Sequence, residues 1–183
     1  MSLRSLPALL RREPAMVDAL VAGSASLAVS DAATAYVLAG MRVLGERRPL
    51  LVVTATVADA ERLTHDLQAF LPTRSVALFP AWETLPFERV SPEVATMGRR
   101  LELLWRLGAD AGGDGAEDGP DVVVAPVRAL LQRLGPLGEE FAPVVVEPGA
   151  RVDQQDLVAE LVRRGYRREY QVDHRGELAV RGG

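Results

Sequence analysis

Leu50-Leu51-Val52-Val53-Thr54-Ala55 is a continuous run of apolar and β-branched residues, and Asp121-Val122-Val123-Val124-Ala125-Pro126 is a second one. Such runs are typical of strands that are buried on both faces of a parallel sheet. Two shorter stretches, Ser26 to Ser30 and Ser75 to Phe79, are further candidate strands. We therefore expect a sheet that contains all four segments, with residues 50–55 covered on both sides.

Segments with a helical pattern alternate with these strands. They are residues 14–21, 32–44, 59–70, 96–107 and 127–134. Asp31 is a candidate N-cap for the second segment. The third has one apolar face, made of Ala60, Leu63, Leu67 and Phe70, and the fourth has another, made of Leu101, Leu104, Trp105 and Gly108. The alternation predicts an α/β fold with a doubly wound, mostly parallel sheet over residues 1–135.

The pattern changes after residue 135, where Gly135-Pro136-Leu137-Gly138 interrupts it. A helix is expected over Asp153 to Arg164, followed by two short strands, Arg168 to Val172 and Glu177 to Val180, around a hairpin-like turn that ends at Gly176. We interpret residues 136–183 as the start of a small α+β domain. Because a lone pair of strands is marginally stable in water, we expect this domain to be incomplete.

The composition excludes several classes of protein. Hydrophobic residues make up 48% and charged residues 25% of the 183 positions, which is ordinary for a globular protein. There is no Cys, and no run approaches the roughly 18 apolar residues of a membrane span or forms a signal peptide. We expect a soluble, cytoplasmic protein without a membrane partner. The net charge of −4 favours a protein or small-molecule partner over nucleic acid.

All 21 basic residues are Arg, and the chain has no Lys. A P-loop needs a Lys for the terminal phosphates and Gly residues to cradle them, and the turn before residue 32 has neither. Asp31 there would repel phosphate from the helix start. The two His, His65 and His174, lie far apart and suggest no metal or catalytic site. We therefore expect no catalytic residue, no metal site and no cofactor.

Two features remain as candidate binding sites. Six arginines lie between residues 163 and 181 against three acidic residues, a local surplus of +3 (Arg163, Arg164, Arg167, Arg168, Arg175 and Arg181). They form either a solvated surface or a docking surface for an acidic protein. The second feature is the loop after the strand that ends near residue 79, with Trp82 and Phe87, and Arg99 in the next helix. It either packs over the sheet edge or holds a ligand, because strand ends carry the sites of such sheets.

Four blocks of the sequence together resemble the bacterial transcription-repair coupling factor (Mfd) family. They are residues 50–55 with the helix that follows, the box from Leu78 to Leu107, residues 121–131, and the stretch from Gly165-Tyr166-Arg167 through Gly182. The last block also resembles UvrB, the helicase of nucleotide excision repair. The blocks follow the family's order and spacing over nearly the whole chain, and the second and fourth are specific.

The resemblance implies that residues 1–135 form a UvrB-like degenerate helicase domain without a P-loop, and that residues 136–183 begin an inserted UvrA-binding domain. In this family that module recruits UvrA to stalled RNA polymerase. Matched position by position, the UvrA-binding residues would be Arg167, Arg168, Arg175 and Arg181. Leu178 departs from the pattern, because UvrB-like sequences often have an aromatic residue there, which puts a stacking contact in doubt.

In the family, the ATP-dependent DNA translocase motor and the RNA-polymerase-binding domain lie further along a longer chain. RNA polymerase and DNA would then be partners of the whole protein. A second hypothesis is a nucleotide- or DNA-binding helicase fragment of the UvrB type, with its ligand at Trp82, Phe87 and Arg99. The Trp82 loop could instead contact another domain.

Overall fold

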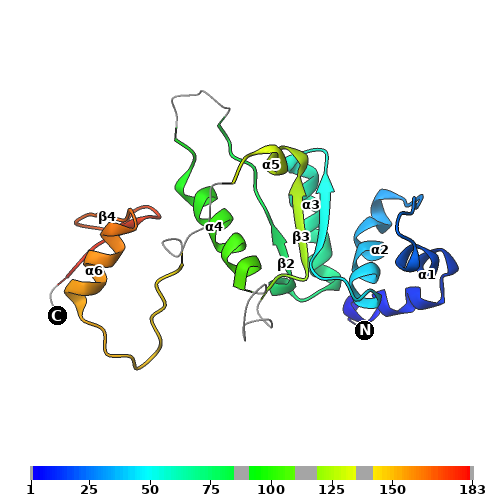
Figure 1. Cartoon of the computed structure of the whole chain (residues 1–183), viewed down its shortest axis with the longest axis horizontal. Coiled ribbons are helices and arrows are strands. Elements are labelled where there is room, and N and C mark those ends of the chain that lie inside the picture. The colour runs from blue at the N-terminus through cyan, green and yellow to red at the C-terminus, as the bar shows by residue number, and fades with distance from the viewer. Residues whose placement is uncertain (1, 85–90, 110–118, 135–141, 182–183) are drawn as a thin grey trace. The chain divides into compact units, whose positions relative to one another are not determined.

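The computed structural model describes residues 2–84, 91–109, 119–134 and 142–181 (Figure 1). The chain forms two compact units. The first comprises Met1–Ala81 and Arg106–Arg133, and the second comprises Trp82–Trp105 and Leu134–Gly183. Residues 82–105 thus group with the C-terminal part of the chain. The functional domain limits at residues 135 and 136 remain a prediction.

The first unit contains a parallel three-stranded sheet in the order β1-β3-β2. Its strands are β1 (Leu50–Thr54), β2 (Val76–Leu78) and β3 (Val122–Pro126). Leu50 of β1 and Val76 of β2 both lie opposite Val122, so β3 is paired on both sides. All five β3 residues are buried, as expected for a central strand. The α/β class and the parallel sheet are confirmed.

The expected strand at Ser26 to Ser30 is wrong, because this segment has no ladder partner and is irregular. Its apolar side chains serve another purpose. Leu27 and Val29 line a recess together with Leu38, which belongs to helix α2 (Asp31–Leu44). Contact with a helix has therefore replaced pairing with a strand.

The expectation that residues 50–55 are buried on both faces is also wrong. The side chains of β1 alternate, with Leu50 and Val52 packed against the core while Leu51 and Val53 are 52% and 50% exposed. The reason is the position of β1 at the edge of this sheet, where one face alone is covered. Four apolar residues in a row, Leu50 to Val53, did not distinguish an edge strand from a central one.

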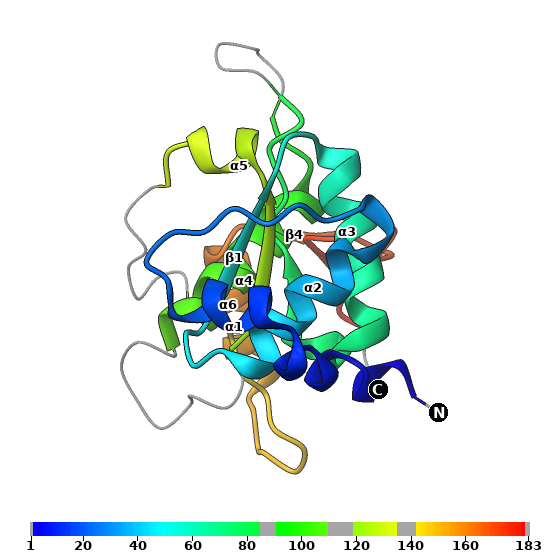
Figure 2. The same cartoon turned by 90° about the vertical axis from the view of Figure 1, so that its right-hand side faces the viewer.

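The core of the first unit lies between the sheet and helix α3 (Val57–Phe70). Ala60 and Leu67 of α3 are fully buried, and Leu63 and Phe70 pack around them, so the apolar face expected for this helix is confirmed. Helix α2 lies beside α3 (Figure 2), and the Tyr36 and Phe70 rings are 5.7 Å apart between their centres. Ser30 occupies the N-cap position of α2, and Asp31 is its first residue.

Short helices complete the first unit. They are the 3-10 helices η1 (Leu3–Ser5), η2 (Pro7–Arg12) and η3 (Thr73–Ser75), and the α-helices α1 (Pro14–Val21) and α5 (Val127–Leu131). Helix η2 packs on α2, and the Tyr36 hydroxyl donates to the carbonyl of Leu6 at 3.2 Å. The Gly40 Cα faces Leu10, because a Cβ built there would lie 2.4 Å from the Leu10 Cδ1 atom.

A buried ion pair connects α2 to the start of β3. Arg42, whose side chain is 8% exposed, donates from Nη2 to Oδ1 of Asp121. Arg48 lies 3.7 Å from the same oxygen, and the Asp121 carbonyl accepts a hydrogen bond from the Leu50 amide at 2.8 Å. Burial raises the pKa of Asp121, but hydrogen bonds from Arg42 and Ser75 and the two arginine charges outweigh it and lower the pKa.

The second unit contains most of α4 (Val94–Ala109) together with α6 (Gln154–Arg163). Asp153 caps α6 by accepting hydrogen bonds from the Gln155 and Asp156 amides at 2.8 and 3.0 Å. The buried side of α4 differs from the expected one. Thr96, Arg100 and Leu103 are buried, whereas Trp105 is 43% exposed. The buried side of α4 thus includes a threonine and an arginine, which the hydrophobic pattern did not place there.

Two very short strands, β4 (Arg167–Arg168) and β5 (Glu177–Leu178), follow α6. They pair in parallel, so the expected hairpin is wrong. The Arg167 amide donates to the Gly176 carbonyl and the Glu169 amide to the Leu178 carbonyl, each at 2.8 Å. The connection over residues 169–176 is longer than the two to five residues of most hairpins, and it lets the chain return before it pairs.

Candidate functional site

The arginines of the C-terminal segment fall into two groups. Arg163 and Arg164, at the end of α6, both pair with Glu160, and the Arg164 Nε–Glu160 Oε1 distance is 2.5 Å. Arg164 also donates from Nη1 to the Ala142 carbonyl. These contacts, led by the Arg164 hydrogen bond, lower the pKa of Glu160. The first group therefore stabilises the end of α6.

The second group, Arg167, Arg168, Arg175 and Arg181, is exposed. Within the described part of the chain, no ion pair joins any of these four side chains to a carboxylate. We call them the arginine surface. These are the positions that the sequence resemblance assigned to UvrA binding, and their guanidinium groups are available to a partner.

Glu177 organises the loop that carries part of the arginine surface. Its Oε2 accepts hydrogen bonds from the amides of Asp173 and His174, both at 2.9 Å. Those two bonds are the main reason that the pKa of Glu177 is lowered. Gly176, the residue before Glu177, has a φ of 83°. A Cβ added there would lie 3.2 Å from Cγ1 of Val94. The loop is therefore held by a carboxylate and lies directly against the first turn of α4.

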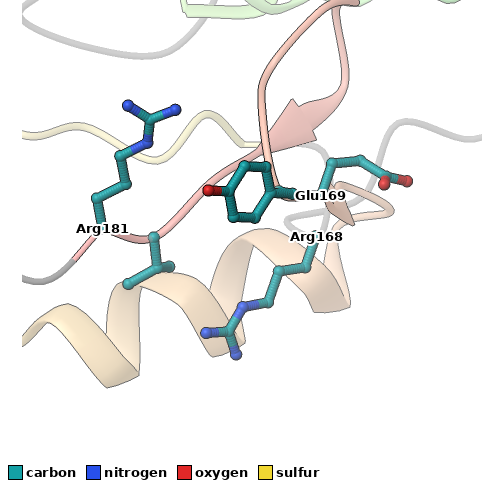
Figure 3. Close-up of a pocket in the computed structure, with 5 residues that line it drawn as sticks. Arg168, Glu169 and Arg181 are labelled. Carbon is teal, nitrogen blue, oxygen red and sulfur yellow. The ribbon is translucent and has the colours of Figure 1, made fainter.

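Arg168 and Arg181 line one recess of the second unit, together with Glu169, Tyr170 and Val180. Its volume is about 660 Å³. Figure 3 shows the Arg168 and Arg181 guanidinium groups on one side in this view, while the Glu169 carboxylate points to the other. Tyr170 is 91% exposed, so the recess combines two cations with a large accessible aromatic side chain.

Arg167 and Arg175 line a different groove, of about 560 Å³, which also includes Arg99 of α4. The structure thus brings together two candidate features that are about 70 residues apart in the sequence. Arg99 is exposed, and within the described residues it makes no ion pair. Its place beside the arginine surface could not be read from the sequence, because that placement depends on how the loop meets α4.

Trp82 contacts a different residue from those expected. The Cζ atom of Arg100 lies 4.5 Å from the centre of the Trp82 ring, and Arg100 is 2% exposed. Next to it, the Thr96 hydroxyl donates to Oε1 of Glu83, which is the main cause of the lowered pKa of Glu83. Phe87, the other aromatic candidate of this loop, lies outside the described residues.

Thr96, Arg100 and Glu83 were missed by the sequence reasoning. A signal was available, because Thr96 and Arg100 are four residues apart and therefore lie on one face of a helix. An arginine on the face that also carries Leu103 needs an aromatic or acidic partner when buried. Trp82 and Glu83 were two of the aromatic and acidic residues in the segment before this helix, and the sequence did not distinguish them from Phe87, Glu88 and Glu93.

The described residues offer little for catalysis. No cluster of three or more His, Asp or Glu side chains in that part of the chain could hold a metal ion. His65 and His174 are both exposed. The helices of the described residues include none whose length and apolar character would allow it to cross a membrane.

Comparison with known proteins identifies the family. A transcription-repair coupling factor of Mycobacterium tuberculosis is 45% identical over 142 residues, which is 76% of this chain and 11% of the relative. That of Myxococcus xanthus is 33% identical over 177 residues, 91% of this chain and 14% of the relative. That of Escherichia coli is 30% identical over 135 residues, 73% of this chain and 11% of the relative. No protein-family model matches the chain.

The chain belongs to the transcription-repair coupling factor family. Its matched segment spans 11% of the length of the mycobacterial relatives. The family resemblance inferred from the sequence motifs is confirmed.

Proposed function

We propose that this chain is a non-catalytic module of a transcription-repair coupling factor and that it recruits UvrA to stalled RNA polymerase. The arginine surface is its contact region. The observation that carries this proposal is the state of Arg167, Arg168, Arg175 and Arg181, which are exposed and make no ion pair within the described residues. Arginine is enriched among the residues that dominate protein interfaces, because its planar group pairs with carboxylates in a bidentate manner.

The proposal includes a UvrB-like, doubly wound first domain that has lost nucleotide hydrolysis. The absence of Lys from the sequence supports this part, since a P-loop requires one. In the whole protein, ATP-dependent translocation on DNA and binding to RNA polymerase would belong to parts outside these 183 residues.

Charge reversal tests the proposal. The double variant R168E/R181E should weaken UvrA binding by about 3 kcal/mol. This is the loss expected for two arginines that become buried in the interface with UvrA and contribute much of its binding energy. R11E/R12E is the matched control, because these arginines of η2 are also exposed and the net charge changes equally. Isothermal titration calorimetry of UvrA into each variant measures the difference. Equal affinity of R168E/R181E and the unmodified chain would refute the proposal.

The second hypothesis, a nucleotide- or DNA-binding fragment, predicts different results. ATP or short duplex DNA at low salt would then raise the melting temperature of the chain. The net charge of −4 and the packing of Trp82 against Arg100 favour the UvrA hypothesis. ATP turnover by the purified chain would exclude the non-catalytic role.

A further inference from the structure

The groove beside α4 combines positive charge with apolar side chains. Arg99, Arg167 and Arg175 contribute three guanidinium groups, while Val94 and Ala95 form part of its lining. Because residues 94 and 95 are the first two of α4, the positive end of the helix dipole adds to the field there. A carboxylate that enters this groove would therefore meet several donors at once.

Two acidic residues, Glu93 and Asp173, also line the groove. The Asp173 carboxylate accepts a hydrogen bond from Nε2 of Gln171 at 3.1 Å. Among the described residues, neither acid forms an ion pair with Arg99, Arg167 or Arg175. None of the three arginines is therefore held in an ion pair by these two acids, although the charge of Arg99 acts on Glu83 and that of Arg167 acts on Glu177.

The mixed charge of the lining indicates the chemistry of that ligand. A nucleic-acid backbone favours a uniformly basic surface, because its affinity comes mainly from neutralised phosphates. The two carboxylates beside the three arginines would repel phosphates and reduce the affinity for a nucleic-acid backbone. Apolar side chains flanked by opposite charges are the arrangement found where proteins meet proteins.

Both walls of the groove are held in place. Glu177 fixes the loop of His174 and Arg175 through two backbone hydrogen bonds at 2.9 Å. Gly176 faces Val94 so closely that a Cβ added to it would lie 3.2 Å from Cγ1 of Val94. On the α4 side, Thr96 and Arg100 anchor the helix to Glu83 and Trp82. A fixed arrangement of donors loses less entropy on binding than a mobile one.

We infer that this groove receives an acidic segment of the protein partner, and that Arg99 of α4 is a binding residue together with Arg167 and Arg175. The inference rests on the proposed function, since the partner it refines is UvrA. It adds a contact from a second element, outside the C-terminal segment in which the arginine surface lies.

The test measures UvrA affinity for the full chain carrying R99E, R175E or both. Each single variant should weaken binding at least tenfold. The double variant should lose less than the product of the two single losses, because both arginines would contact the same segment. R151E is the matched control, since Arg151 is exposed in the same unit and does not line the groove. Circular dichroism melting verifies that every variant is folded.

The possible outcomes separate this inference from the proposed function. If R168E/R181E loses UvrA while R99E binds like R151E, the groove inference is overturned and the proposed function stands. If UvrA does not bind at all but a labelled oligoglutamate peptide binds and requires Arg99, the proposed function fails and the acidic-ligand groove stands. If R99E weakens binding of short duplex DNA and leaves UvrA and oligoglutamate unaffected, the groove is a nucleic-acid site and the inference is overturned.

Discussion

Arg100 lies over the ring of Trp82, with its Cζ atom 4.5 Å from the ring centre. Arg100 is 2% exposed, and this burial lowers the pKa of its guanidinium group. A buried cation gains more from an aromatic face than an exposed one does. Trp82 therefore stabilises α4 within the second unit, in addition to any role that its loop has in binding.

We predict that Trp82→Ala lowers the free energy of unfolding by about 3 kcal/mol, because apolar packing is lost and Arg100 loses its aromatic face. Urea denaturation followed by circular dichroism measures the change. Trp82→Phe is the control, since it keeps a smaller aromatic face and should lose about half as much. Equal losses in the two variants would show that the aromatic face contributes nothing.

Thr96→Val should reduce the amount of folding stability that the protein loses when the pH falls from 7 to below about 4. The Thr96 hydroxyl lowers the pKa of Glu83, so the Glu83 carboxylate binds a proton more weakly in the folded protein than in the unfolded chain. The resulting stability is present at neutral pH and disappears as the pH falls through about 4, where glutamate normally titrates. We expect Thr96→Val to lower the free energy of unfolding by about 1 kcal/mol at pH 7 and by little below pH 4. The loss at pH 7 is small because Glu83 is exposed and water screens its interactions. A loss that is equal at both pH values would contradict this explanation.

Asp121→Asn should destabilise the first unit by about 3 kcal/mol at neutral pH, because Arg42 is buried and would lose its charged partner. Because the pKa of Asp121 is lowered, this contribution declines progressively as the pH falls below about 4, where an ordinary aspartate titrates. Asp18→Asn is the matched control, since Asp18 is exposed on α1 and the charge change is identical. Thermal melts at pH 7 and pH 3 measure both effects. Similar melting temperatures for the two variants at pH 7 would refute the role of the pair.

Gly176→Ala and Gly149→Ala form a matched pair. Both glycines have a positive φ, 83° and 84°, so alanine costs about 1 kcal/mol at each position. Only at Gly176 does the new Cβ meet another side chain, Cγ1 of Val94 at 3.2 Å, while nothing lies within 4 Å of Gly149. We expect G176A to move the loop of Arg175 and weaken UvrA binding, and G149A to leave it unchanged. Equal UvrA affinities would show that the position of the loop is irrelevant.

Most helices could be located from the sequence because their signals are local. Helix α1 occupies Pro14–Val21 as expected, and α6 begins directly after its Asp153 cap. Strand β3 was recognisable because a run of valines between an acid and a proline suits a central strand. The segment at Ser26 to Ser30 was not predictable in the same way, since a strand needs a partner that the local sequence does not specify.

The candidate site was located in part. The family motif and the surplus of arginine pointed to residues 167–181, and the lack of Lys showed that the sequence contains no P-loop lysine. The sequence did not show that Arg163 and Arg164 are already paired, because their partner Glu160 lies outside residues 163–181, where the surplus of positive charge was found. The parallel pairing of β4 and β5 was hidden for a similar reason, since it depends on the path of the loop between them.

Short-range patterns indicated the α/β class, the resemblance of four sequence blocks indicated the family, and composition alone showed the absence of lysine. Each of these depends on residue identity or on neighbours within a few turns. The tertiary structure alone decided that Arg100 would lie on Trp82 and that Arg99 would join Arg167 and Arg175 in one groove. Those contacts join residues far apart in the chain or select one helix face, and the balance of packing and desolvation that sets them exists only once the chain is folded.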